Sequence, residues 1–168
     1  VAIDGQRSLI YLLDQLRTKC GKAASDIPQM PPRSRCLGVE FIEFAVDDRS
    51  ADELARLLAG LGFRNTAHHK SKAVSRWTQG SINLVINKEK EGFAHSHYIT
   101  HGPSVCAIGL MVESAAATLD RAEKLRDTPF RQKVGPSELE IPAVRGMGGS
   151  LLYFLDPSSK LSKVWDIE

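Results

Sequence analysis

The chain has 168 residues, of which 42% are hydrophobic and 25% charged, and 22 Lys and Arg oppose 20 Asp and Glu for a formal charge of +2. This composition excludes a disordered chain, a collagen-like chain and a disulfide-stapled miniprotein. No apolar run approaches the roughly 18 residues of a membrane span, and the interspersed charges disfavour a nucleic-acid surface.

The three cysteines, Cys20, Cys36 and Cys106, favour free thiols and a reducing compartment because their number is odd and their spacing unpaired. No basic stretch followed by an apolar one opens the chain, as a signal peptide would require. We therefore expect a cytoplasmic protein that binds neither membrane nor nucleic acid. Neither end has the character of a natural terminus, so we expect a piece of a longer polypeptide.

The first 22 residues carry a helical pattern, because Leu9, Leu12, Leu13 and Leu16 recur at spacings of three and four. Residues 23–36 contain three prolines and predict a linker. Residues 37–160 predict the main domain, and residues 161–168 the start of a linker to a further domain. The first helix is thereby expected to belong to a preceding domain.

The main domain opens with a predicted strand at Val39–Val46. Ser50 and Glu53 form a capping-box pattern ahead of an apolar stripe of leucines, which predicts a helix. Three further strands are predicted near 64–68, 73–78 and 82–87, with Gly80 in the last turn.

The same order returns in the second half of the domain. Predicted elements are a strand at 105–112, a helix capped by Ser114, and strands near 131–134, 139–144 and 151–155. The Gly-rich loop at 146–149 predicts a hairpin turn, because a strand and not a helix follows it.

Local sequence matches support an internal repeat. Val46-Asp47 matches Val112-Glu113 at an offset of 66 (112 − 46), and Gly80-Ser81-Ile82 matches Gly149-Ser150-Leu151 at an offset of 69 (149 − 80). We therefore predict an α+β fold of two βαβββ modules, at 37–90 and 104–160. One helix per module leaves the other sheet face free to form a shared cleft.

This arrangement resembles the vicinal oxygen chelate superfamily. Four segments are similar to 4-hydroxyphenylpyruvate dioxygenase-like proteins, namely 38–47, 79–85, 101–108 and 148–154. Together they resemble the first domain of the dioxygenase-like half of bacterial bifunctional proteins, whose N-terminal sugar-phosphate-isomerase-like barrel acts as 3-dehydroshikimate dehydratase. Residues 4–17 look like the end of that barrel.

The resemblance implies that a divalent metal, iron in the dioxygenases, lies in the second domain and not in this one. The family's ligand positions map here to Phe41, Ala107 and Phe154, which have no lone pairs to offer a cation. This chain is therefore expected to hold no cofactor of its own. It would be mainly a structural or interaction domain of an aromatic-catabolism enzyme.

Other readings remain open. Glu43, Asn83 and Ser150 are polar candidates for a cleft site, and His95, His97 and His101 would bring imidazoles together if their segment were a strand. An enzyme domain could use either set, and a small aromatic-acid binding domain could use the cleft without chemistry. Expected partners are the other domains of the parent chain, and the apolar cleft leaves a homo-oligomer open.

Overall fold

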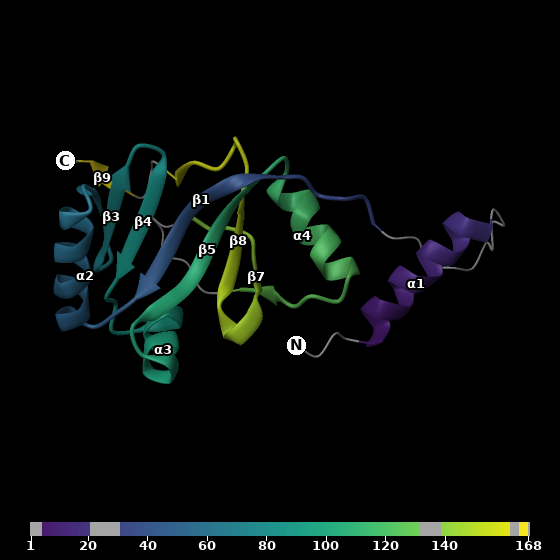
Figure 1. Cartoon of the computed structure of the whole chain (residues 1–168), viewed down its shortest axis with the longest axis horizontal. Helices are drawn as coiled ribbons and strands as arrows, with labels where there is room; N and C mark the ends of the chain where they lie inside the picture. Colours follow the sequence, from purple (N-terminus) through teal and green to yellow (C-terminus); the bar gives the residue numbers. More distant parts are fainter. Residues whose placement is uncertain (1–4, 21–30, 132–138, 162–164, 168) are drawn as a thin grey trace.

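The computed structural model describes residues 5–20, 31–131, 139–161 and 165–167, and in these ranges a single mixed sheet dominates. Its nine strands lie in the order β6-β7-β8-β5-β1-β4-β3-β2-β9 (Figure 1). The strands are β1 (Cys36–Ala45), β2 (Arg64–His69), β3 (Val74–Gln79), β4 (Ile82–Asn87), β5 (Ser104–Val112), β6 (Pro129–Phe130), β7 (Ala143–Arg145), β8 (Leu151–Leu155) and β9 (Trp165–Ile167).

Four α-helices accompany the sheet within the described ranges: α1 (Gly5–Cys20), α2 (Asp48–Gly60), α3 (Gly92–His101) and α4 (Ala115–Lys124). A short 3-10 turn at Met147–Gly149 joins β7 to β8, so the predicted hairpin at the Gly-rich loop is confirmed. Gly148 and Gly149 adopt left-handed backbone angles there, at φ of 66° and 81°, which explains the glycines. None of the described helices has the length and apolar character needed to cross a bilayer.

The predicted two-module repeat is confirmed by strand pairing. β1 pairs parallel to β4, β5 pairs parallel to β8, and β1 pairs antiparallel to β5 at the junction. Ile42 lies opposite Ile108 in that junction, at the same offset of 66 (108 − 42) that links the sequence repeats. The two modules are therefore related by a local two-fold axis between these isoleucines.

The last strand of each module follows a different offset from the one that the sequence suggested. Leu84 pairs with Ile42 and Leu152 with Ile108, which makes the structural offset 68 (152 − 84) and not 69. A shift of one residue moves every side chain of a strand to the opposite face. This difference decides which residues of β8 face the cleft.

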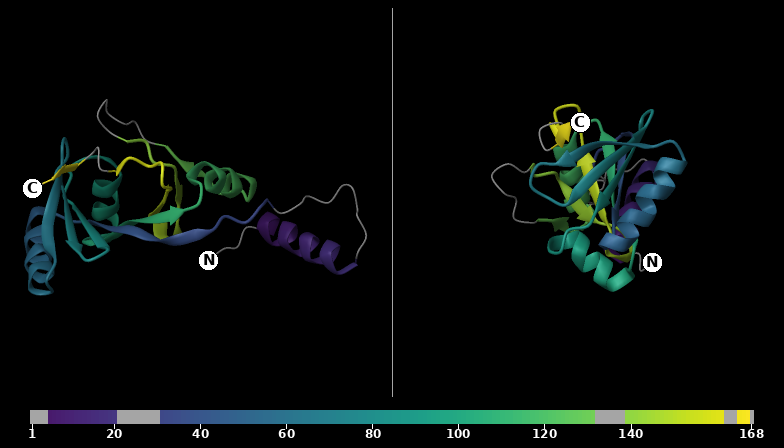
Figure 2. Two further views of the ribbon diagram at one scale, coloured as in Figure 1. Left: turned by 90° about the horizontal axis from the view of Figure 1, so that it is seen from above. Right: turned by 90° about the vertical axis from the view of Figure 1, so that its left-hand side faces the viewer.

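Helices α2 and α4 cover the outer face of the sheet, one over each module (Figure 1; Figure 2). Beneath α2, Leu58 packs with Val46 and Ile86, and beneath α4, Ala122 packs with Val112 and Phe154. Helix α4 thus buries the apolar stripe predicted for it, whereas α2 buries only Leu54 and Leu58 of its predicted leucines and leaves Leu57 and Leu61 exposed. Both helices leave the inner face of the sheet uncovered.

Asp47, and not Ser50, caps α2. The Asp47 carboxylate accepts a hydrogen bond of 2.8 Å from the backbone N–H of Ser50, and the helix begins at Asp48. The capping-box prediction was wrong because Ser50 already lies inside the first turn, while Glu53 accepts from Arg49 one turn away. The predicted cap of α4 is confirmed, since Ser114 Oγ accepts from the N–H of Ala117.

Helix α3 corrects the prediction of a loop or strand at residues 95–101. It packs on the inner face of the sheet, where its Ala94 joins Ala45, Ala107 and Leu151 in a buried cluster. The sequence conceals this helix because its buried positions include a polar residue, His97. Apolar periodicity therefore gives no signal over this segment.

Several boundaries also differ. β1 begins at Cys36, inside the predicted linker, and β9 lies in the segment predicted to start an interdomain linker. Of the predicted strand at 139–144 only the end is formed, and the prediction at 131–134 falls mostly outside the described residues. These short edge strands depend on pairing partners, which local sequence does not reveal.

Helix α1 projects away from the sheet, as Figures 1 and 2 show. Its Leu9, Leu12 and Leu16 are each more than half exposed. Residues 31–35 lie across α4 instead: Arg121 donates to the carbonyls of Pro31 and Pro32, and the hydroxyls of Ser34 and Thr118 hydrogen-bond. The domain fold accordingly starts near residue 31.

Candidate functional site

A cavity of about 450 Å³ opens on the inner face of the sheet, between the strands of both modules and α3. Its floor combines Phe41 and Glu43 of β1 with Asn83 of β4 and Tyr153 of β8. These residues converge because the two modules curl toward one another around the β1–β5 junction. The predicted cleft therefore exists, and it contains two of the three polar residues proposed for it.

Glu43 is the deepest charged group of this floor. Its Oε1 accepts a 2.7 Å hydrogen bond from Asn87 Nδ2, and Asn87 Oδ1 in turn accepts from the backbone N–H of Glu89. Burial raises the pKa of the Glu43 carboxyl, although the Asn87 hydrogen bond and the Lys72 charge act in the opposite direction. No side chain or backbone group of the described residues donates to the second oxygen, Oε2.

Asn83 and Tyr153 add two more polar atoms to the floor. Asn83 Nδ2 donates to the backbone carbonyl of Glu40 at 3.0 Å, so its Oδ1 is directed away from that carbonyl. Among the described residues, neither Asn83 Oδ1 nor the Tyr153 hydroxyl has a hydrogen-bond partner. Burial, followed by the nearby Glu43 and Cys106, raises the pKa of the Tyr153 phenol, which is therefore neutral at physiological pH.

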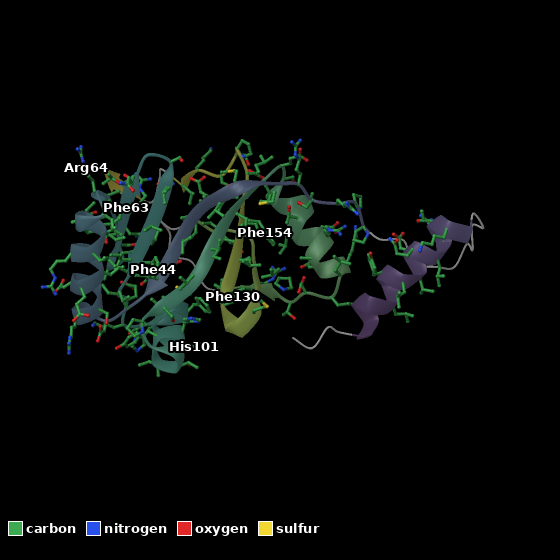
Figure 3. All side chains as sticks on the ribbon, viewed as in Figure 1. Phe44, Phe63, Arg64, His101, Phe130 and Phe154 are labelled. Atoms are coloured by element: carbon green, nitrogen blue, oxygen red, sulfur yellow. The ribbon has the colours of Figure 1, made fainter. Side chains whose placement is uncertain are left out.

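Aromatic rings line two parts of the cavity. The Phe41 and Tyr153 rings lie 6.0 Å apart at the floor, and Phe93 of α3 meets Phe130 of β6 edge-on at 5.3 Å. The Arg145 guanidinium lies 5.8 Å from the Phe93 ring centre and 5.2 Å from that of Phe130, which Figure 3 labels. These cation–π contacts hold α3 against the second module and close one end of the cavity.

Charged residues line the cavity with an excess of carboxylates. The lining contains Lys72, Arg76 and Arg131 as cations, together with His69. Five glutamates oppose them, namely Glu40, Glu43, Glu89, Glu91 and Glu140. The cavity as a whole is therefore slightly acidic.

The conserved sequence pattern of the N-terminal domain of hydroxyphenylpyruvate dioxygenase (HPPD) matches residues 33–168. The chain belongs to this family. The predicted resemblance to dioxygenase-like proteins of the vicinal oxygen chelate type is thereby confirmed, and the match begins where the structure places the start of the domain fold.

Longer relatives of this HPPD-type domain include a dehydratase and a dioxygenase. A 3-dehydroshikimate dehydratase of Pseudomonas aeruginosa is 42% identical over 170 residues, covering 98% of this chain and 27% of that protein. A 4-hydroxyphenylpyruvate dioxygenase of Pseudomonas sp. is 36% identical over 132 residues, covering 79% of this chain and 36% of that protein. The chain thus spans about a quarter to a third of the curated relatives it matches.

Solved structures agree with the fold of the HPPD-type domain. A fusion protein of a xylose isomerase-like TIM barrel and 4-hydroxyphenylpyruvate dioxygenase superposes with a TM-score of 0.87 at 40% identity, over 98% of this chain and 27% of that one. Methylmalonyl-CoA epimerase of Mycobacterium tuberculosis superposes with a TM-score of 0.56 at 15% identity, over 78% of this chain and 95% of that one, which shows the shared fold alone.

The three mapped metal positions of the HPPD-type domain do not meet in the structure. Phe41 and Ala107 face inward as expected, but Phe154 lies on the outer face, packed against α4 (Figure 3). The prediction for Phe154 was wrong because β8 pairs with β5 in a register that turns Phe154 to the outer face. Tyr153 and Leu151 occupy the inward positions of this strand.

The described residues of the inner face also lack the donor set that a 2-His-1-carboxylate site needs. The side chains of Phe41, Ala107 and Leu151 offer only carbon, and Glu43 contributes a carboxylate to the floor beside them. Within the part of the chain that the structure describes, no group of three His, Cys, Asp or Glu side chains could hold a metal ion. The residues present do not fit the catalytic metal that the fold family implies.

The remaining candidates lie elsewhere. Ser150 belongs to the β7–β8 turn, where its hydroxyl donates to the Met147 carbonyl, and it does not line the cavity. His97 and His101 stack on α3 with ring centres 4.4 Å apart. His95 is off that face because helical spacing, and not strand alternation, places these residues, so the proposed triad is not formed.

Sequence reasoning missed Tyr153 and Asn87 as cavity residues. Alternation along 151–155 does group Tyr153 with Leu151 and Leu155, but only the pairing of β8 with β5 identifies that face as the inner one.

Cys106 is fully buried, as expected, and it belongs to the same buried cluster as Ala107 because a bulge interrupts the β1–β5 register there.

Proposed function

We propose that this chain is a metal-free first domain of a longer HPPD-like protein, with a mainly structural and interaction role. The observation that carries the proposal is that Phe41, Ala107 and Leu151 place carbon side chains at the inward strand positions. Phe41 lies against Gly109, where even a methyl group would overlap its ring, so the aromatic ring fills the space near the local two-fold axis. A cation placed there would meet apolar surface in place of ligands.

The longer protein would join this domain to a dehydratase-type barrel before it and a metal-bearing dioxygenase-like domain after it. Alignments support the first junction: the dehydratase relative matches over 98% of this chain, whereas the dioxygenase match covers 132 residues and the family pattern begins at residue 33. Helix α1 therefore corresponds to sequence that the dehydratases share. Its exposed leucines suit a helix that packs on a preceding domain.

Metal titration tests the metal-free state. The purified chain is stripped with a chelator, titrated with Fe(II), Mn(II), Co(II) or Zn(II) by calorimetry, and analysed for metal content. We expect well under 0.1 equivalent of tightly bound metal. Near-stoichiometric binding that disappears in Glu43→Gln, and persists in a Glu140→Gln control at the cavity rim, would contradict the proposal.

The complete parent coding sequence tests the domain arrangement. We expect a barrel pattern before residue 1 and, after residue 168, a second pair of modules with two histidines and one glutamate on inward strand positions. A second half that lacks these residues would contradict the proposal that the following domain binds iron. Self-association and a cytoplasmic location stay predictions.

A further inference from the structure

We propose that the cavity binds a small uncharged aromatic ligand that carries hydroxyl groups, a phenol or diphenol, without help from a metal ion. This inference goes beyond the structural role proposed above and does not depend on it, because a domain can be metal-free whether or not its cavity is occupied.

The polar atoms at the floor call for a hydrogen-bond donor. Glu43 Oε2 and Asn83 Oδ1 are acceptors that no described residue satisfies, and both belong to residues lining the cavity. The orientation of the Asn83 amide is fixed, since only its NH₂ group can donate to the Glu40 carbonyl. Water can satisfy acceptors that face a cavity until a ligand displaces it, so a ligand hydroxyl that reproduces these hydrogen bonds suits this floor.

The Tyr153 hydroxyl extends the same pattern. It is the one cavity-lining phenol in the described chain, and it has no protein partner there. A neutral phenol can both donate and accept. It would therefore pair with a second oxygen of the ligand while Glu43 accepts from the first.

The walls favour an aromatic ring. Phe41 and Tyr153 at the floor, with Phe93 and Phe130 at one end, surround the polar atoms with four aromatic side chains. Aromatic groups gain from offset or edge contacts with such rings beyond simple area burial. A volume of about 450 Å³ lies in the range of small-molecule sites.

The charges around the cavity disfavour an anion. Five glutamates face three Lys or Arg side chains, and the ammonium of Lys72 already interacts electrostatically with Glu43. A bound carboxylate would therefore be repelled more than it is attracted. An uncharged ring with hydroxyl donors avoids this cost.

Three probes separate these contributions in calorimetric or ligand-observed NMR titrations of the chelator-treated chain. Resorcinol has two hydroxyls, 1,3-dimethoxybenzene has the same ring without donors, and benzoate has a charge. We expect saturable resorcinol binding with a dissociation constant of about 0.1–1 mM, as for other ligands of this size. The dimethoxy compound and benzoate should bind at least about tenfold more weakly.

Matched variants locate the site. Glu43→Gln keeps the acceptor for Asn87 but turns the free acceptor into a donor, and Tyr153→Phe removes only the hydroxyl. Each should weaken the binding of resorcinol by about tenfold. Glu140→Gln, which removes the same charge from the rim, should change the affinity for resorcinol by less than about twofold. Circular dichroism and melting temperature confirm that each variant is folded.

Resorcinol binding that does not saturate would overturn the proposal. Resorcinol binding to the folded Glu43→Gln and Tyr153→Phe variants as tightly as to the unaltered chain would also overturn it. Benzoate binding as tight as resorcinol would overturn the assignment of a neutral donor. Because a chelator is present, these outcomes do not depend on metal binding, which the titration described earlier measures separately.

Discussion

Phe41 and Gly109 form a matched pair across the β1–β5 junction. A Cβ at position 109 would overlap three atoms of the Phe41 ring, and the ring cannot withdraw without opening the cavity floor. We expect Gly109→Ala to reduce the free energy of unfolding by about 1–3 kcal/mol, as overpacking of a buried site does. Denaturant titration measures this change.

Gly38→Ala provides the control for that substitution. Gly38 also lies in β1, but nothing lies within 4 Å of the position where its Cβ would be. The substitution should change stability by less than about 0.5 kcal/mol. Equal losses in both variants would mean that the Phe41 contact is not the cause.

Asp47 links two helices through one carboxylate. It accepts from the N–H of Ser50 at the start of α2 and from the Tyr98 hydroxyl of α3 at 3.0 Å. The hydrogen bonds from Ser50, followed by that from Tyr98, lower the pKa of Asp47 to about 2. The stabilisation is therefore complete above the ordinary pKa near 3.8 and is lost as the pH falls toward about 2.

We accordingly expect Asp47→Asn to lower the melting temperature by a few degrees at pH 6 and by little or nothing at pH 2. Asp52→Asn, on the exposed side of the same helix, should leave the melting temperature nearly unchanged at both pH values. Thermal unfolding followed by circular dichroism across this range tests the prediction. A loss that persists undiminished at pH 2 would show that the carboxylate charge is not responsible.

At the scale of elements, α3 depends on a buried histidine. His97 is only 8% exposed and stacks against His101. Burial, and then the His101 charge, lowers the pKa of His97, while its hydrogen bond to the Val105 backbone acts in the opposite direction. A histidine whose folded pKa is lowered stabilises the fold above its unfolded pKa near 6.5, and this stability is lost as the pH falls through the folded pKa.

His97→Phe should therefore flatten the decline in melting temperature between pH 7 and pH 5, although the lost hydrogen bond lowers the value at pH 7. His95→Gln, which changes a histidine off the stacked face of α3, should keep the slope of the unaltered protein. Differential scanning calorimetry over this pH range measures both slopes. An unchanged slope in His97→Phe would assign the acid sensitivity to other groups.

At the scale of the whole molecule, we expect the domain to be stable without α1. The buried residues of the three clusters lie between Ala45 and Phe154, and no described residue of α1 belongs to them. Removal of residues 1–30 should leave the melting temperature within about 2 °C of the full chain. A cut after residue 35 should lower it clearly, because it also removes the contacts of Pro31, Pro32 and Ser34 with α4.

The sequence predicts much of this fold because each module is locally consistent. Leu54 and Leu58 mark the buried face of α2, Ser114 caps α4, and the repeats at offset 66 identify the two modules. It predicts less of the site. α3 buries His97, which apolar patterns do not register, and Ser150, expected in the cleft, lies in the β7–β8 turn instead.

The sequence, through its resemblance to the dioxygenase-like family, already indicated that the inward positions of β1 and β5 carry Phe41 and Ala107, which cannot ligate a cation. Tertiary structure decided what accompanies them. The parallel pairing of β8 with β5 fixes a register that directs Tyr153 inward and Phe154 toward α4, and α3 closes one end of the cavity. Register and packing join residues that are distant in the chain, and no local pattern encodes a one-residue choice between two apolar faces.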